Sequence, residues 1–140
     1  MTFVIASVLF LLFTNSFAQV AKTDTMMKTG NPVNVNGPVA RFDKTVFEFA
    51  DLLQDSPETA SFVLTNDGKE PLIIASASAS CGCTNLSWSK DPILPGKSIT
   101  ISATYNAATL GNFIKSVTVR TNSSDQPVIL QIKGKVVPKA

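Results

Sequence analysis

The stretch SITISATY, from Ser98 to Tyr105, alternates apolar and hydroxyl side chains without interruption. Successive side chains of a β-strand point to opposite faces, so this period of two predicts a strand with one face toward a core and the other toward solvent. We expect Ile99, Ile101, Ala103 and Tyr105 to face the core.

The same period recurs through the rest of the chain after Val39. The repeats lie at residues 47–49, 60–65, 72–79, 116–120 and 128–136. Clusters of Gly, Pro, Asn and Asp separate them, and no window supports a helix of ordinary length. One such cluster is Asn66-Asp67-Gly68, a predicted turn in which we expect Gly68 to adopt a positive φ. Roughly seven antiparallel strands in about a hundred residues predict an all-β, immunoglobulin-like β-sandwich.

The N-terminal end reads as an export signal. An apolar run from Phe3 to Phe13 is followed by Ser16 and Ala18 in the small positions of a cleavage site. The run is shorter than the roughly 20 residues of a membrane span, which favours a cleaved signal over an uncleaved anchor. We therefore predict a signal peptide at 1–18, with cleavage between Ala18 and Gln19, and export to the periplasm or the cell exterior.

Three further segments complete the predicted organisation. Residues 19–38 are rich in Thr, Asn, Gly, Pro and Lys and have no period that could bury a face, so they are predicted to form a flexible linker. The sandwich domain is predicted at 39–137, with a short tail at 138–140. No segment of the mature chain is apolar enough to predict a transmembrane span.

Composition argues against several classes of function. The formal net charge is +2 without a Lys or Arg cluster, which argues against a nucleic-acid surface. The chain contains no histidine, so a Ser-His-Asp triad, a Cys-His pair and a His-based zinc site cannot be built from it alone. The sequence therefore predicts no catalytic residues, no cofactor and no enzymatic activity.

The two cysteines lie in the run Cys81-Gly82-Cys83-Thr84. An exported protein exposes them to an oxidising compartment, where disulfides form and persist. If the period of two continues from Ile73 through Ala79, both thiols share the face of the alanines, and the bulky Trp88 could fill the space there. Gly82 can equally mark a bulge or turn that breaks this parity.

Physical chemistry leaves four roles open for this pair. A Cys81–Cys83 bridge closes a loop of three residues, for which chain entropy predicts a stabilisation of only about 1.6 kcal/mol. Such a tight ring is expected to be strained and to suit a redox switch better than a staple. Free thiolates could instead hold Cu(I), with Cys81 and Cys83 as the metal ligands. The third role is structural, a local disulfide or a pair of packed thiols that fixes a bulge at the end of a strand. The fourth is a loop that binds a partner.

Several motifs together resemble a known family. They are Cys81-Gly82-Cys83-Thr84, Leu94-Pro95-Gly96-Lys97-Ser98, and Gly111-x-Phe113-x-Lys115-x-Val117-x-Val119-x-Thr121-Asn122. In this order they are similar to a bacterial immunoglobulin-like family catalogued as domain of unknown function 1573, and the similarity covers about Val39 to Val137. The resemblance implies an exported, often envelope-located sandwich related in shape to major-sperm-protein-like and cilium-associated modules. It implies no catalytic residues.

Two hypotheses for function follow. The first is a non-enzymatic module of the bacterial cell envelope, which contacts another envelope protein through a sheet edge or a loop end. The alternative is a small periplasmic thiol-redox or copper-handling protein that uses Cys81 and Cys83.

Overall fold

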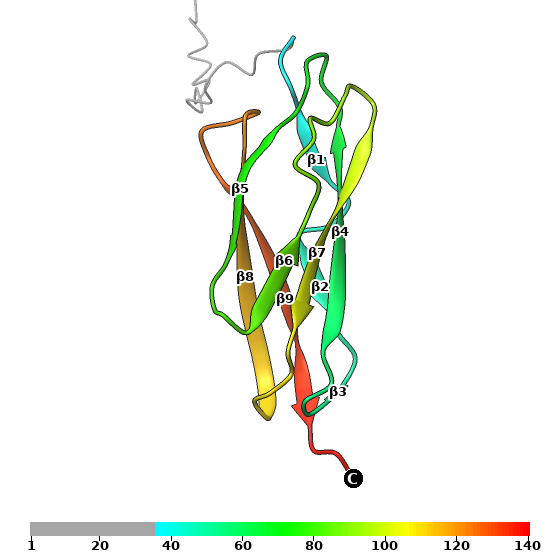
Figure 1. Ribbon diagram of the computed structural model, residues 1–140, viewed down its shortest axis with the longest axis vertical. Helices are drawn as coiled ribbons and strands as arrows, with labels where there is room; N and C mark the ends of the chain where they lie inside the picture. The colour runs from blue at the N-terminus through cyan, green and yellow to red at the C-terminus, as the bar shows by residue number, and fades with distance from the viewer. Residues whose placement is uncertain (1–35) are drawn as a thin grey trace, which may run out of the picture. The chain divides into compact units, whose positions relative to one another are not determined.

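Two β-sheets pack face to face in the computed structural model, which describes residues 36–140 (Figure 1). The predicted signal peptide, its cleavage site and residues 19–35 of the predicted linker lie outside the described residues. The strands of the described part are β1 (Ala40–Phe42), β2 (Val46–Glu48), β3 (Leu52–Leu53), β4 (Glu58–Asn66), β5 (Ile74–Ala79), β6 (Thr84–Ser87), β7 (Ser98–Tyr105), β8 (Gly111–Thr121) and β9 (Val128–Val137).

The sheets have the orders β1-β4-β7-β6 and β2-β9-β8-β5, and β3 also pairs with β9. The predicted class, an all-β immunoglobulin-like sandwich, is confirmed. Two details differ from the expected antiparallel pattern. Both β2 and β3 run parallel to β9, because the chain leaves β1 at one sheet and then follows β9 of the other sheet in two short steps. The described residues form nine strands where roughly seven were predicted, and the short strands β1, β3 and β6 lie outside the predicted segments.

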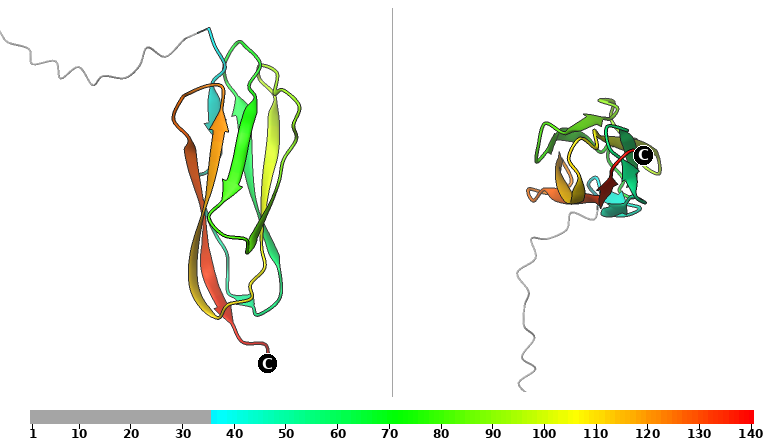
Figure 2. Two further views of the ribbon diagram at one scale, coloured as in Figure 1. Left: turned by 60° about the vertical axis from the view of Figure 1, so that its left-hand side comes forward. Right: turned by 90° about the horizontal axis from the view of Figure 1, so that it is seen from below.

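The core lies between the sheets and follows the alternation that the sequence shows. On β7, Ile101, Ala103 and Tyr105 are buried and Ile99 is half-buried, as predicted. Figure 2 shows the same two layers from the side and from below. At one end of the core the ring of Tyr105 stacks on that of Phe113, with centroids 4.1 Å apart. Each strand therefore contributes one apolar face to a single closed interior.

A buried asparagine organises the opposite end of the sandwich. Asn66 is fully buried, and its Nδ2 donates to the carbonyls of Glu70 and Ile93, both at 2.8 Å. Its Oδ1 accepts from the backbone N–H of Gly68 at 2.9 Å and from that of Val39 at 3.4 Å. One side chain thus joins three separate segments of the chain.

Gly68 has a different role from the one predicted. Its φ is not in the left-handed region, which among the described glycines is adopted by Gly96 and Gly111. Instead, a Cβ at position 68 would collide with the backbone of Gly37 and lie 2.5 Å from the nitrogen of Val39. Gly37, which the sequence places in the linker, is buried here and accepts from the N–H of Lys69 at 3.2 Å. Close approach of two backbones therefore requires the glycine.

Candidate functional site

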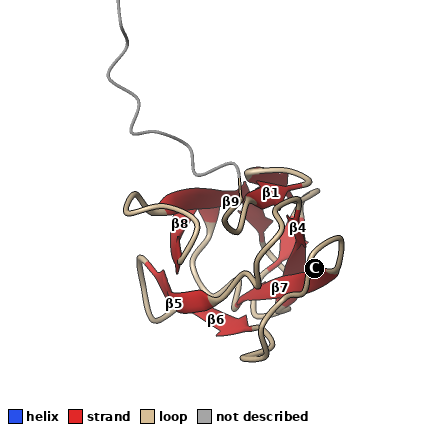
Figure 3. Ribbon diagram, turned by 90° about the horizontal axis from the view of Figure 1, so that it is seen from above, coloured by secondary structure: helices blue, strands red, loops and turns tan. Residues whose placement is uncertain are grey.

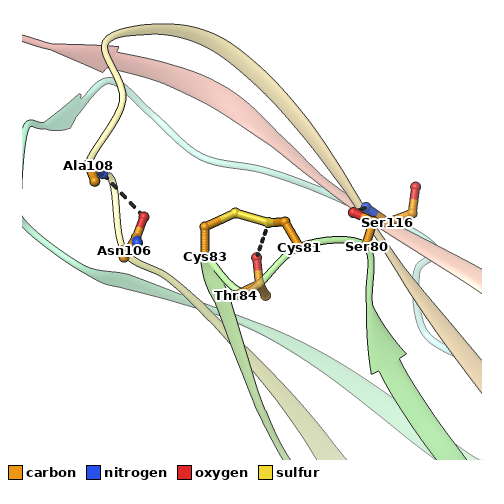
Figure 4. Close-up of a disulfide and its surroundings, with 7 residues drawn as sticks. All are labelled: Ser80, Cys81, Cys83, Thr84, Asn106, Ala108 and Ser116. Atoms are coloured by element: carbon orange, nitrogen blue, oxygen red, sulfur yellow. Dashed lines mark hydrogen bonds between the residues drawn. A yellow bond between two sulfur atoms is a disulfide. The ribbon is translucent and has the colours of Figure 1, made fainter.

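The two cysteines form a disulfide in the turn that joins β5 to β6 (Figure 4). Because β5 and β6 belong to different sheets, this turn is where the chain crosses from one sheet to the other. The Cα atoms of Cys81 and Cys83 lie 5.3 Å apart, and the carbonyl of Cys81 accepts from the N–H of Thr84 at 3.4 Å. The sequence left open whether the cysteines continue the strand or lie in a bulge or turn. They lie in a turn, because β5 ends at Ala79.

Hydrogen bonds that do not involve sulfur fasten both ends of this turn. Before it, the N–H of Ser80 donates to the carbonyl of Ser116 at 2.8 Å, and the N–H of Ser116 donates to the Ser80 hydroxyl at 3.1 Å. After it, the carbonyl of Cys83 accepts from the N–H of Asn106 at 3.0 Å. Asn106 is itself held by its side chain, which accepts from the N–H of Ala108 (Figure 4).

The two cysteines sit in different surroundings. Cys83 is half-buried and packs against the core, whereas a Cβ added at Gly82 would have no atom within 4 Å. Cys81 lies with its Sγ 3.9 Å from the hydroxyl of the buried Thr84. Since both sulfurs are used in the S–S bond, metal ligation by this pair would require its reduction first. Among residues 36–140, no group of three or more His, Cys, Asp or Glu side chains could hold a metal ion.

Removing both sulfurs is expected to leave the domain folded. The disulfide closes so short a loop that its loss should cost no more than about 1.6 kcal/mol, which for a domain of this size lowers the melting temperature by about 10 °C or less. The measurement is thermal denaturation of the Cys81→Ser, Cys83→Ser double variant followed by circular dichroism. A double variant that is unfolded at room temperature would show that the S–S bond, and not the hydrogen bonds around it, holds the crossover.

β6, the strand that follows the disulfide turn, forms one edge of its sheet. Among the described residues it pairs only with β7, in the register Thr84↔Tyr105 to Ser87↔Ser102. Figure 3 views the sandwich end-on and places β6 beside β5, the edge strand of the other sheet. That this segment is an edge could not be predicted, because an edge is defined by which strands pair and not by the pattern of residues.

The backbone N–H and carbonyl groups of Leu86 point away from β7. In an antiparallel pair, residues alternate between those that exchange hydrogen bonds with the partner strand and those that do not. The bond from Asn106 N–H to the Cys83 carbonyl marks the bonded positions, so Asn85 and Ser87 are bonded to β7 and Leu86 is not. The partner of Leu86 is Ala103, and by the same alternation the backbone groups of Ala103 serve β4 on the other side.

Two described groups with shifted pKa values, Arg41 and Asp43, lie at the far edge of this sheet, on β1 and just after it. A hydrogen bond and the charge of Asp67 raise the pKa of Arg41. Desolvation raises the pKa of Asp43, but donation from the N–H of Val63, at 2.7 Å, and the neighbouring Lys44 outweigh it, so the net pKa lies below its ordinary value. Both groups tie β1 to β4, and neither lies on the β6 side of the sheet.

A hollow with a volume of about 290 Å³ lies on the other sheet. Its apolar wall includes Phe49, Phe113 and Ile114, and its rim carries acidic and basic side chains. Two of these, Lys133 and Glu48, form an ion pair at 3.0 Å. The hollow is open to solvent and lacks a convergent set of polar groups, so it offers less chemistry than the β6 side of the molecule.

Solved structures confirm the fold at low sequence identity. A protein of unknown function from Porphyromonas gingivalis W83 matches with a TM-score of 0.63 and 15% identity, over 72% of this chain and 48% of that chain. A PapD-like domain of human CEP192 matches with a TM-score of 0.62 and 10% identity, over 72% of this chain and 87% of that chain. This chain thus spans about half of the Porphyromonas chain, and likenesses at such identity show the fold alone.

The same fold occurs in part of an enzyme. The VesB protease of Vibrio cholerae matches with a TM-score of 0.55 and 13% identity, over 69% of this chain but only 31% of that chain. No curated protein matches this sequence. Within the described part, the structure contains no helix long and apolar enough to cross a membrane.

The sequence profile of one family covers the whole sandwich, from residue 40, where β1 begins, to residue 136 near the end of β9. This confirms the resemblance inferred from the sequence motifs. Because the match extends over well more than half of the chain, the protein belongs to the family described as a protein of unknown function, DUF1573.

Proposed function

We propose that this domain is a non-enzymatic binding module of the bacterial cell envelope, and that the open edge of β6 takes up an extended segment of a partner protein. The observation that carries the proposal is the unpaired backbone of Leu86 on an edge strand. In strand addition, main-chain hydrogen bonds to such an edge supply affinity, and side-chain contacts supply specificity.

Apart from its short length of four residues, β6 lacks the features that natural sheets use against unwanted pairing at an edge. Its residues, Thr84 to Ser87, carry no charge and include no proline, and their register with β7 is regular. The other described edges carry a charge or an irregularity in addition to any shortness. The register of β5 shifts between Ile74 and Ser76, while β1 and β2 are three residues long and carry Arg41 and Glu48.

The non-enzymatic part of the proposal rests on chemistry. A chain without histidine lacks the commonest general base. The groups with perturbed pKa values, Arg41 and Asp43, are accounted for by ion pairing and hydrogen bonding between neighbouring strands. The placement in the envelope rests on the predicted signal peptide at residues 1–18. The resemblance of the sequence to an exported family supports the same placement.

A proline at position 86 tests the proposed edge. Leu86→Pro removes the outward N–H without deleting a hydrogen bond to β7, and we expect it to weaken partner binding about tenfold or more. Leu86→Ala is the matched control, because it loses the same side-chain packing but keeps the N–H. The partner is first identified by cross-linking the exported wild-type protein in intact cells, and its affinity for the three forms is then measured.

The two variants separate docking from stability. We expect Leu86→Ala to keep most of the wild-type affinity for the partner and Leu86→Pro to lose it. If both variants bind as well as the wild type, β6 is not the docking edge. If both lose binding equally, the Leu86 side chain and not the open backbone carries the contact.

A further inference from the structure

We propose that the Cys81–Cys83 disulfide is a thiol–disulfide exchange site, at which an external thiolate attacks Cys83 and Cys81 leaves as a thiolate stabilised by Thr84. The co-reactant is a thiol, either a small molecule or the dithiol of another protein. This activity is separate from docking at β6, because it can be measured on the isolated protein without a partner.

The disulfide is placed for exchange and not for holding the fold. It spans two positions in the chain, and hydrogen bonds from Ser80, Ser116 and Asn106 already fix both ends of the turn. These bonds do not involve sulfur and persist after reduction. Gly82 is exposed and lies between the two half-buried cysteines, and a Cβ there would meet no atom within 4 Å, so the turn lies at the surface, where a reductant can approach it. Disulfides that solvent can reach are more labile than fully buried ones.

Thr84 distinguishes the two sulfurs. In the disulfide neither sulfur carries a hydrogen, so the contact of 3.9 Å between the Thr84 Oγ1 and the Cys81 Sγ can only have the hydroxyl as donor. Thr84 is buried, with 6% of its surface exposed, so water competes little for this hydroxyl. A hydrogen bond to the charged form favours a thiolate, and the better-stabilised thiolate leaves faster. Cys81 is therefore the leaving sulfur.

The exchange balances in two steps. The external thiolate forms an S–S bond to the Cys83 Sγ, the bond between Cys81 and Cys83 breaks, and its electron pair remains on Cys81. A second thiolate of the reductant then bonds to the first reductant sulfur and displaces Cys83. The protein gains two electrons and two protons as a dithiol, and the reductant is oxidised to a disulfide. Thr84 is a positioning residue throughout, since it forms no covalent bond.

The first test uses the wild-type full chain and glutathione. We expect millimolar glutathione to open the disulfide in the native protein, measured by alkylation of the freed thiols and intact mass. Circular dichroism of the reduced protein should remain native. A disulfide that survives this treatment, or a reduced protein that unfolds, would overturn the proposal. A parallel reaction with a reduced thioredoxin-type protein identifies the source: a rate at least about a hundredfold higher indicates a protein dithiol, and comparable rates indicate a small thiol.

The second test isolates the hydroxyl. Thr84→Val keeps the shape of the side chain and removes the donor, so its reduction should be about tenfold slower than that of the wild type. Thr84→Ser keeps the donor and should restore the rate to within about twofold, which a merely structural role of the residue would not predict. Equal rates for all three forms would refute the role of Thr84. If Thr84→Val does not fold, fragment-ion mapping of acid-quenched wild type decides, because glutathione on Cys81 instead of Cys83 would contradict the assignment.

Discussion

Replacing Asn66 with alanine is expected to lower the free energy of unfolding by about 4 kcal/mol, because four backbone groups lose their partner at once. The N–H groups of Val39 and Gly68 and the carbonyls of Glu70 and Ile93 all bond to this side chain. Asn66 is fully buried, so water cannot replace it without opening that end of the sandwich. Urea denaturation of the purified domain measures the change.

Asn122 provides the matched control. Its Oδ1 accepts from the N–H of Ile73 at 2.8 Å, and its Nδ2 donates to the carbonyl of Pro71 at 3.1 Å. The chemistry is that of Asn66, but the residue is exposed, so Asn122→Ala should cost about 1 kcal/mol or less. Equal losses for the two variants would show that burial does not decide the role of Asn66.

Gly68→Ala is the second substitution with a large expected effect. The added Cβ would meet the Gly37 carbonyl, and the carbon of Pro38 would lie 2.8 Å away. Both contacts are backbone, which cannot move aside as a flexible side chain would. Overpacking of this kind should cost about 3 kcal/mol, measured by the same urea denaturation.

Gly82→Ala is the control for this substitution, because a Cβ at position 82 meets no atom within 4 Å and the φ of Gly82 is not positive. It should leave the stability within about 0.5 kcal/mol of the wild type. If Gly68→Ala were equally harmless, residues 37–39 would not pack against the turn in solution as they do here.

The strands with one buried face could be predicted from the sequence because their signal is local. On β7 and β9 every second residue is apolar, and this period alone decides which side chains face the core. The role of Gly68 could not be predicted in this way. Its constraint comes from residues about thirty positions earlier in the chain, whereas the Asn-Asp-Gly pattern signals only a turn.

Part of the candidate site could be predicted from the sequence. The spacing of Cys81 and Cys83 predicted that a bridge would be local and weakly stabilising, and the structure contains that bridge. The position of Thr84 beside the Cys81 sulfur depends on a tight turn that the sequence left open. The open edge at Leu86 depends on which strands pair, and four residues between a turn and Trp88 carry too short a pattern to show it.

Docking by strand addition requires an open edge at β6, and amide hydrogen exchange reports whether this edge is open in the free protein. We expect the Leu86 amide to exchange at least about tenfold faster than the amides of Asn85 and Ser87, which bond to β7, and faster than that of Ala103 in the middle of the sheet. Equal protection of Leu86 and its two neighbours would rule out an open edge, because it would mean that another segment or a second copy of the chain already covers β6.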